Sequence, residues 1–222
     1  MIRTKLVRAA LVALATVVAT ARGGALADDS GAANAAAAKA ASVVHLKCVL
    51  KRGDREFRRS IPSVMVDASG LLLCSTSALG TGGTGRFKAN ATDLKVVFGA
   101  DPKEYPAVLV AQDTKVDLAF AQILDLEGRV VTPVDLSKQA AIDVGTEVWQ
   151  VVRKSSGFDY AAVVGTGYVT CRVEKPRPMW GIAGDARQIG LPVYDAAGGM
   201  LGVVTRQMGA EGGEEGPMRA FG

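Results

Sequence analysis

The 222-residue sequence has a single histidine, no pair of cysteines spaced C-x-x-C and no cluster of histidine and cysteine at metal-ligand spacing. Zinc and dithiol redox chemistry therefore lack the ligands they need, and we expect no metal and no cofactor. Convincing helical periodicity is also absent, which excludes a helical bundle. Catalysis by a histidine base would have to rely on His45 alone.

The first 27 residues have the order of a secretory signal peptide. Arg3, Lys5 and Arg8 precede an apolar run over residues 9–21, and Ala25-Leu26-Ala27 supplies the small residues of a cleavage site. We expect cleavage after Ala27 and a periplasmic or secreted protein, with an uncleaved anchor as the alternative. The apolar run is short for a membrane span, and we expect no membrane contact beyond this segment.

Charge gives no support for a nucleic-acid partner. The chain has 26 basic and 22 acidic residues. Four basic residues lie in the acid-free signal segment, so 22 of each remain, without a basic stripe interleaved with aromatics. We therefore expect no nucleic acid to bind. The one basic run, residues 51–59, also contains Asp54 and Glu56, and we interpret it as a solvated hairpin tip in preference to an anion site.

The segments between the signal peptide and the chain end divide by composition. Residues 28–42 are alanine-rich and predict a mobile or weakly helical linker. Residues 209–222 predict a Gly/Glu-rich tail with little to bury. The intervening residues 43–208 suit one domain, including a fold of two small barrels.

The three cysteines each lie within an apolar strand pattern. There a free thiol behaves as a small hydrophobe, so we interpret Cys48, Cys74 and Cys171 as buried thiols. An oxidising compartment also permits one disulfide, of undetermined pairing. A catalytic or redox thiol is the reading with the least support.

Short runs rich in Val, Leu and Ile, separated by Gly, Pro, Asp or Ser, predict a β protein. The predicted strands are residues 42–50, 61–66, 71–74, 94–98, 107–111, 118–124, 130–134, 147–152 and 161–173, followed by a hairpin that turns at 195–199. Many short strands in one domain predict a sandwich or closed barrels, and periodicity alone does not choose between them.

Three segments resemble the catalytic segments of trypsin-like serine proteases, particularly the HtrA type. Residues 67–79 read D-A-S-G-L-L-L-C-S-T-S-A-L and are similar to the segment leading into T-N-x-H-V. Residues 113–121 read D-T-K-V-D-L-A-F-A and resemble D-x-x-x-D-L-A-V. Residues 187–194 read R-Q-I-G-L-P-V-Y and resemble G-N-S-G-G-P-L. The resemblance implies two antiparallel six-stranded β-barrels with the ancestral active site in the cleft between them.

This alignment leaves no intact catalytic triad. It places Ile189 at the serine position, Ser77 at the histidine position and Asp117 at the aspartate position. Isoleucine has no nucleophilic atom, and a neutral alcohol cannot accept a proton near neutral pH. Asp117 is expected to be a strand-end carboxylate that accepts hydrogen bonds from the backbone or from Ser77.

The oxyanion turn of the family corresponds to Arg187, Gln188 and Ile189. The family has glycine before and after its nucleophile, and Arg187 and Leu191 stand at these glycine-like positions, so we expect no intact oxyanion hole. His45 lies well before the family's histidine position. We interpret it as a half-buried or surface strand residue and not as a recruited base.

The sequence therefore predicts a secreted or periplasmic protease homologue that is catalytically inactive and binds an extended peptide or a protein partner. HtrA-type proteases often carry a PDZ domain behind the protease domain, and we expect none within this sequence. Two alternatives stay open. One is an active serine-type endopeptidase that uses displaced residues, and the other is an unrelated secreted β module with a binding function.

Overall fold

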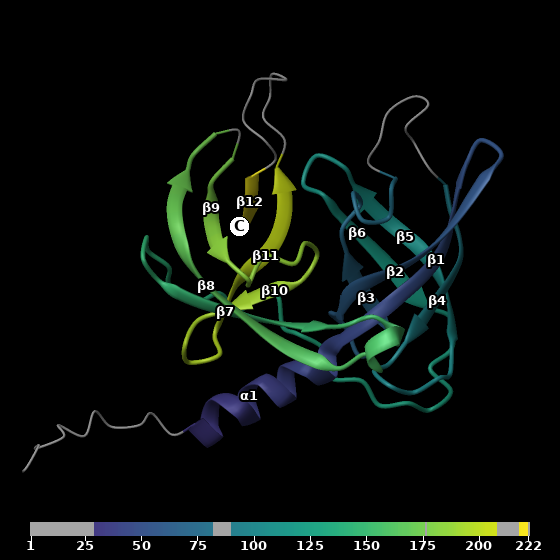
Figure 1. Ribbon diagram of the computed structural model, residues 1–222, viewed down its shortest axis with the longest axis horizontal. Coiled ribbons are helices and arrows are strands. Elements are labelled where there is room, and N and C mark those ends of the chain that lie inside the picture. The colour runs from purple at the N-terminus through teal and green to yellow at the C-terminus, as the bar shows by residue number, and fades with distance from the viewer. Residues whose placement is uncertain (1–28, 82–89, 176, 208–217, 222) are drawn as a thin grey trace, which may run out of the picture.

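The computed structural model describes residues 29–81, 90–175, 177–207 and 218–221. Figure 1 shows these residues as two β-barrels side by side, with one helix beside them. The predicted signal segment, with its cleavage site at Ala27, lies outside the described residues. Within these residues no helix has the length and apolar character that crossing a bilayer requires.

The first barrel closes in the strand order β1-β2-β3-β6-β5-β4, and neighbouring strands are antiparallel. Its strands are β1 (Val43–Arg52), β2 (Arg55–Met65), β3 (Leu71–Cys74), β4 (Asn90–Val97), β5 (Tyr105–Asp113) and β6 (Leu118–Ile123). Along β1, Val44, Leu46, Cys48 and Leu50 are buried in the core of this barrel. The two-residue period of a strand sends these alternate side chains inward.

The second barrel closes in the order β10-β11-β12-β9-β8-β7, again with antiparallel neighbours. Its elements are β7 (Glu147–Arg153), the short 3-10 helix η2 (Ser156–Phe158), β8 (Ala162–Val173), β9 (Met179–Gly184), β10 (Pro192–Tyr194), β11 (Met200–Gln207) and β12 (Met218–Phe221). The all-β prediction and the two six-stranded barrels are therefore confirmed.

An apolar cluster joins the two barrels. Val64 and Leu73 of the first barrel pack in one cluster with Leu191 and Tyr194 of the second, and Ala40 of the helix completes it. All five side chains are buried. The site predicted between the barrels therefore lies beside a packed core.

The alanine-rich segment expected to be a mobile or weakly helical linker is the helix α1 (Asp29–Ser42). Alanine has the highest helix propensity, and Lys39 in the last turn suits the negative end of the helix dipole. Tertiary contacts fix the helix: Ala40 is buried, the Lys39 ammonium lies 4.6 Å from the centre of the Tyr194 ring, and Arg153 Nη2 donates to the Ala40 carbonyl at 2.8 Å.

Two expectations were wrong at the level of single elements. Residues 130–134 form no strand: Val130 is exposed, while Val134 is buried between the barrels and its N–H donates to the Met65 carbonyl at 2.8 Å. This apolar run is an extended connection between the barrels. The strands β9 and β12 were not predicted, and β12 lies within the segment expected to be a tail, where it pairs with β11 and β9.

Candidate functional site

Asp117 ends the tight turn between β5 and β6 and points its carboxylate into the junction of the barrels. Its backbone has a positive φ of 58°, a left-handed conformation that aspartate tolerates better than most residues. Only 4% of the residue is exposed. The turn therefore holds the Asp117 carboxylate at the junction of the barrels.

Five donor groups surround this carboxylate. Oδ1 accepts from Thr76 Oγ1 at 2.9 Å and from the Ser77 N–H at 2.7 Å. Oδ2 accepts from Ser77 Oγ at 3.1 Å and from the Arg206 N–H at 3.0 Å. Ser75 Oγ lies 2.9 Å from Oδ1 and 3.0 Å from Oδ2. The bond from Ser77 is the one that the sequence analysis expected, and the bond from Arg206 links the second barrel to the first.

The hydroxyls in this Asp117 cluster are poorly placed for nucleophilic chemistry. Ser75 is fully buried, and its Oγ also lies 2.8 Å from Ser77 Oγ and accepts the Ala78 N–H at 3.1 Å. Ser77 is half-buried. A carboxylate is a weak base toward an alcohol, so the cluster can orient hydroxyls but has no group suited to take their protons near neutral pH.

The turn that carries Ile189 is held by hydrogen bonds on the second barrel. The Arg187 N–H donates to the Asp185 carbonyl at 2.9 Å, and the Gln188 N–H donates to Gln150 Oε1 at 2.8 Å. The side chain of Ile189 packs against the core of the second barrel. Two of the three predicted oxyanion-turn N–H groups thus have protein acceptors.

Gln150, whose role the sequence did not indicate, holds this turn through its side-chain amide. Its amide is fully buried on β7, and Nε2 donates to the carbonyls of Gln188 at 3.0 Å and Leu191 at 3.1 Å. Its Oε1 accepts the Gln188 N–H, so the Gln150 side chain forms three hydrogen bonds with the same turn, two as a donor and one as an acceptor. The sequence signal that could have revealed Gln150 is its position as a polar residue within an apolar strand pattern.

Gly190 brings the turn into direct contact with the first barrel. Its φ is +80°, and a Cβ built on it would lie 2.8 Å from the Ser75 backbone nitrogen. Only glycine fits such an approach. The structure therefore places Gly190, the neighbour of Ile189, against Ser75 of the Asp117 cluster.

Four cavities, of about 780, 540, 360 and 220 Å³, lie elsewhere on the described residues. None of these four is lined by Ser77, Asp117 or Ile189. The 780 Å³ cavity opens on β7, β8 and β9 of the second barrel, and the 360 Å³ cavity on β1, β2 and β4 of the first.

His45 is buried, which corrects the expectation of a half-buried or surface residue. Its Nδ1 lies 2.8 Å from Ser60 Oγ, its Nε2 lies 3.1 Å from the Arg153 carbonyl, and its ring contacts Tyr160. Burial lowers the pKa of His45 below its usual 6.5. None of these partners belongs to the Asp117 cluster, so the structure gives His45 a packing role between β1 and β7.

All three cysteines are free, which leaves the disulfide alternative without support. Cys48 and Cys74 lie in the first barrel core, and Cys171 is partly buried. Burial raises the pKa of Cys48 to about 11 and the pKa of Cys74 to about 12. Both of these thiols therefore stay protonated and unreactive near neutral pH.

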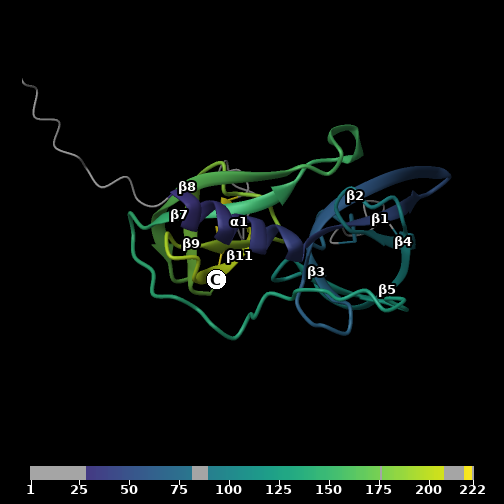
Figure 2. The ribbon, with the colours of Figure 1, turned by 90° about the horizontal axis from the view of Figure 1, so that it is seen from below.

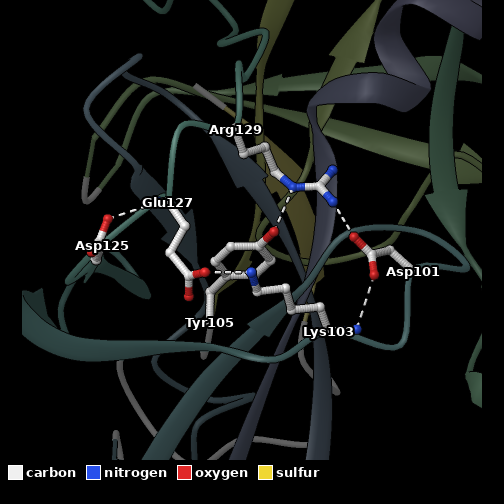
Figure 3. Close-up of polar contacts among 6 residues, drawn as sticks. All are labelled: Asp101, Lys103, Tyr105, Asp125, Glu127 and Arg129. Atoms are coloured by element: carbon white, nitrogen blue, oxygen red, sulfur yellow. Dashed lines mark hydrogen bonds and ion pairs between the residues drawn. The ribbon is translucent and has the colours of Figure 1, made fainter.

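A second polar cluster, on the first barrel, is formed by Asp101, Lys103, Tyr105, Asp125, Glu127 and Arg129 (Figure 3). Arg129 forms an ion pair with Asp101 and donates from Nε to the Tyr105 hydroxyl at 3.0 Å. Lys103 forms an ion pair with Glu127. These contacts tie the loop after β4 to the loop after β6, and they pair both cations of the cluster with carboxylates.

Comparison with solved structures identifies the architecture. The HtrA-type protease AlgW, in a variant solved with a decapeptide, has a TM-score of 0.61 and 21% identity over 85% of this chain and 62% of its own. The structure of Deg5 has a TM-score of 0.62 and 19% identity over 81% of this chain and 86% of its own. The chain has the fold of HtrA-type, trypsin-like proteases.

The same likeness extends to AlgW with a tripeptide, at a TM-score of 0.59 and 22% identity over 85% of this chain and 58% of that one. This chain therefore spans less than two thirds of either AlgW chain. No protein-family model matches the sequence, and no curated protein sequence matches it. At these identities the likeness to HtrA-type proteases concerns the fold alone.

Proposed function

We propose that this chain is a catalytically inactive homologue of HtrA-type proteases, located in the periplasm or secreted, that binds an extended peptide or a protein partner. The observation that carries the proposal is the turn at Ile189. The alignment with HtrA-type proteases puts an isoleucine at the nucleophile position, and the Arg187 N–H donates to the Asp185 carbonyl, so it is not free to stabilise an oxyanion.

The first-barrel side of the junction supports the same proposal. Ser77 at the histidine position donates to Asp117, so the carboxylate has no imidazole to orient. The two AlgW structures contain peptides, which makes an extended peptide the first ligand to test here. Backbone pairing with an exposed strand edge requires none of the missing catalytic groups.

The inactivity is tested with casein, fluorogenic peptides and a fluorophosphonate probe. The purified protein is expected to show no turnover above a heat-killed control and no labelling, while an active HtrA-type protease assayed in parallel shows both. Reproducible labelling of any serine would establish an active hydrolase with displaced residues and overturn the proposal.

Reversion of the site sharpens this test. Ser77→His and Ile189→Ser are each expected to stay inactive, because nucleophile and base act as a unit. The double variant is expected to remain poor unless Arg187→Gly also frees the turn. Leu191→Gly has a further cost, since Leu191 is fully buried between the barrels and its removal leaves a cavity worth roughly 3 kcal/mol.

The location has its own measurement. N-terminal sequencing of the protein from an extracytoplasmic fraction is expected to begin at Asp28. An intact Met1 on protein recovered from the cytoplasm would exclude secretion without touching the proposal of inactivity.

A further inference from the structure

The hairpin of β1 and β2 projects beyond the first barrel as an arm. It is visible at the upper right of Figure 1 and at the right of Figure 2. Every residue from 51 to 60 is exposed. Gly53, with φ of +57°, opens the two-residue turn between the strands, as a tight hairpin turn of this kind requires. The arm is therefore a regular two-stranded element surrounded by solvent.

One edge of this arm has no strand partner within the described residues. β1 is paired on both sides, with β2 and with β4. β2 is paired with β1 along its length but with β3 only at Val64 and Met65. The outer edge of β2 between Arg55 and Ser63 is thus unpaired in the part of the chain that the structure describes.

The register shows which backbone groups this edge presents. Arg52 and Arg55 close the two-residue turn and form a hydrogen-bonded pair, so every second pair below them is also hydrogen-bonded. The N–H and C=O groups of Glu56, Arg58 and Ser60 consequently point outward. Pro62, which has no N–H, stands at the next outward position. The open edge therefore offers three consecutive outward-facing residues to an extended chain.

The two faces of the arm carry different charges. Lys51, Glu56 and Arg58 share one face, where Lys51 pairs with Glu56 at 2.8 Å. The other face, which we name the Arg55 face, carries Arg55, Phe57 and Arg59 at alternate positions of β2. In the sequence these residues form one run of mixed charge. The register places Arg55, Phe57 and Arg59 together as an Arg-Phe-Arg stripe beside the open edge.

This stripe goes beyond what a solvated hairpin tip needs. Arg52 lies directly opposite Arg55 and adds a third arginine to this face. Phe57 is 46% exposed between two arginines. Pairing of the edge with a second copy of this chain would bring arginines together again, so the stripe favours a partner of the opposite charge.

We propose that the β2 edge binds an acidic peptide in extended conformation, which adds a strand to the arm. Acidic residues on either side of an apolar residue, at alternate positions, would face Arg55, Phe57 and Arg59 in turn. Arginine holds a carboxylate through two parallel hydrogen bonds, and the peptide backbone pairs with the outward groups of β2. This surface lies on the first barrel away from the Asp117 cluster, so its test does not depend on the proposed inactivity.

The test follows amide shifts of the isotope-labelled protein during titration with the peptide Thr-Asp-Thr-Val-Thr-Asp-Thr at low salt. Shifts are expected at residues 55–61 and should shrink as salt rises. A peptide of the same composition with adjacent spacing, Thr-Thr-Asp-Val-Asp-Thr-Thr, is expected to bind at least fivefold more weakly. Equal binding of the two peptides would overturn the proposal, because undirected charge attraction would then suffice.

Variants separate the side chains from the backbone edge. The double variant Arg55→Glu/Arg59→Glu changes only exposed residues and is expected to weaken binding at least tenfold. Arg58→Pro removes one outward N–H and is compared with Arg58→Ala, which loses the same side chain and keeps the N–H. Weaker binding in the proline variant alone supports strand addition, provided its circular dichroism matches that of the alanine variant.

Other occupants of the arm give distinct results. If the protein binds anionic vesicles through Arg55 and Arg59 and shows no shifts with the acidic peptide, the partner is a membrane and the proposal fails. The proposal also fails if sedimentation shows a dimer that Arg58→Pro dissolves, since the edge then pairs with a second copy.

Discussion

On the first-barrel side of the junction a buried carboxylate, Asp117, gathers five donor groups, whereas on the second-barrel side a buried amide, Gln150, holds one turn through three hydrogen bonds. A carboxylate only accepts, so each of its neighbours must donate. An amide both donates and accepts, and it can follow a backbone turn that offers both kinds of group. The carboxylate thus has a structural reason to be present, independent of any catalysis.

The comparison also shows how the two halves depend on each other. The Arg206 N–H reaches Asp117 from the second barrel, while Gly190 of the turn lies against the Ser75 backbone of the first. Each side therefore completes the other. Loss of either should loosen the junction, but the charged side should cost more, because buried groups around a missing charge stay unsatisfied.

The largest expected effect is that of Asp117→Asn. The amide NH₂ would face donors that now bond to a carboxylate oxygen, and the free energy of unfolding should fall by about 3 kcal/mol. Chemical denaturation measures this loss. Asp54→Asn, on an exposed carboxylate in the turn between β1 and β2, is the control and should change stability little. An equal loss in the two variants would contradict the fastening role of Asp117.

Gln150→Leu should come next. It leaves the Gln188 N–H and the carbonyls of Gln188 and Leu191 without their partner, and we expect a loss of about 2 kcal/mol. Hydrogen exchange should accelerate at residues 188–191. Gln188→Ala is the matched control, because that side chain makes only a 3.5 Å contact with the Ile189 carbonyl. Unchanged hydrogen exchange at residues 188–191 would show that Gln150 does not hold the turn.

Within the Asp117 cluster, Ser75 and Ser77 should differ. Ser75→Ala removes a fully buried hydroxyl that contacts both carboxylate oxygens and accepts the Ala78 N–H, at a cost of about 1.5 kcal/mol. Ser77→Ala removes a half-buried hydroxyl and should cost about 0.5 kcal/mol, since its N–H still bonds to Asp117. The reverse order in thermal unfolding would show that Ser77 is the main support.

The smallest effect concerns pH. His45 has a lowered pKa when folded, because it is buried and faces Arg153 and Lys47. The unfolded chain then binds more protons as the pH falls below 6.5, so the free energy of unfolding should decrease there and level off below the folded pKa. His45 is the only histidine, so in untagged protein His45→Asn should remove this slope between about pH 7.5 and about pH 5.5. A slope that persists would assign it to other groups.

Short-range patterns predicted the strands, because alternating apolar residues such as those of β1 report local structure directly. The two barrels and the expected positions of Ser77, Asp117 and Ile189 came from the resemblance to trypsin-like proteases. Gln150 and Arg206 could not be found in this way, since their partners lie 38 and 89 residues away. The burial of His45 likewise depends on Arg153, which is 108 residues distant.

Tertiary surroundings also explain the missing strand and the helix that the sequence left open. The run from Val130 to Val134 has strand composition, but its position between two closed barrels leaves it no neighbour with which to form a ladder. Helix α1 has no apolar stripe because alanine is small, and its stability comes from contacts with the barrels. In both cases the conformation of the segment depends on its contacts with the barrels.

Arg153 makes the stability of helix α1 depend on a residue far along the chain. Its guanidinium closes the end of α1 at the Ala40 carbonyl, 113 residues earlier in the chain, and also bonds to the Val43 carbonyl. A helix of 14 residues is marginal by itself in water. Helix α1 therefore becomes stable only when the second barrel has folded and has brought Arg153 to the end of the helix.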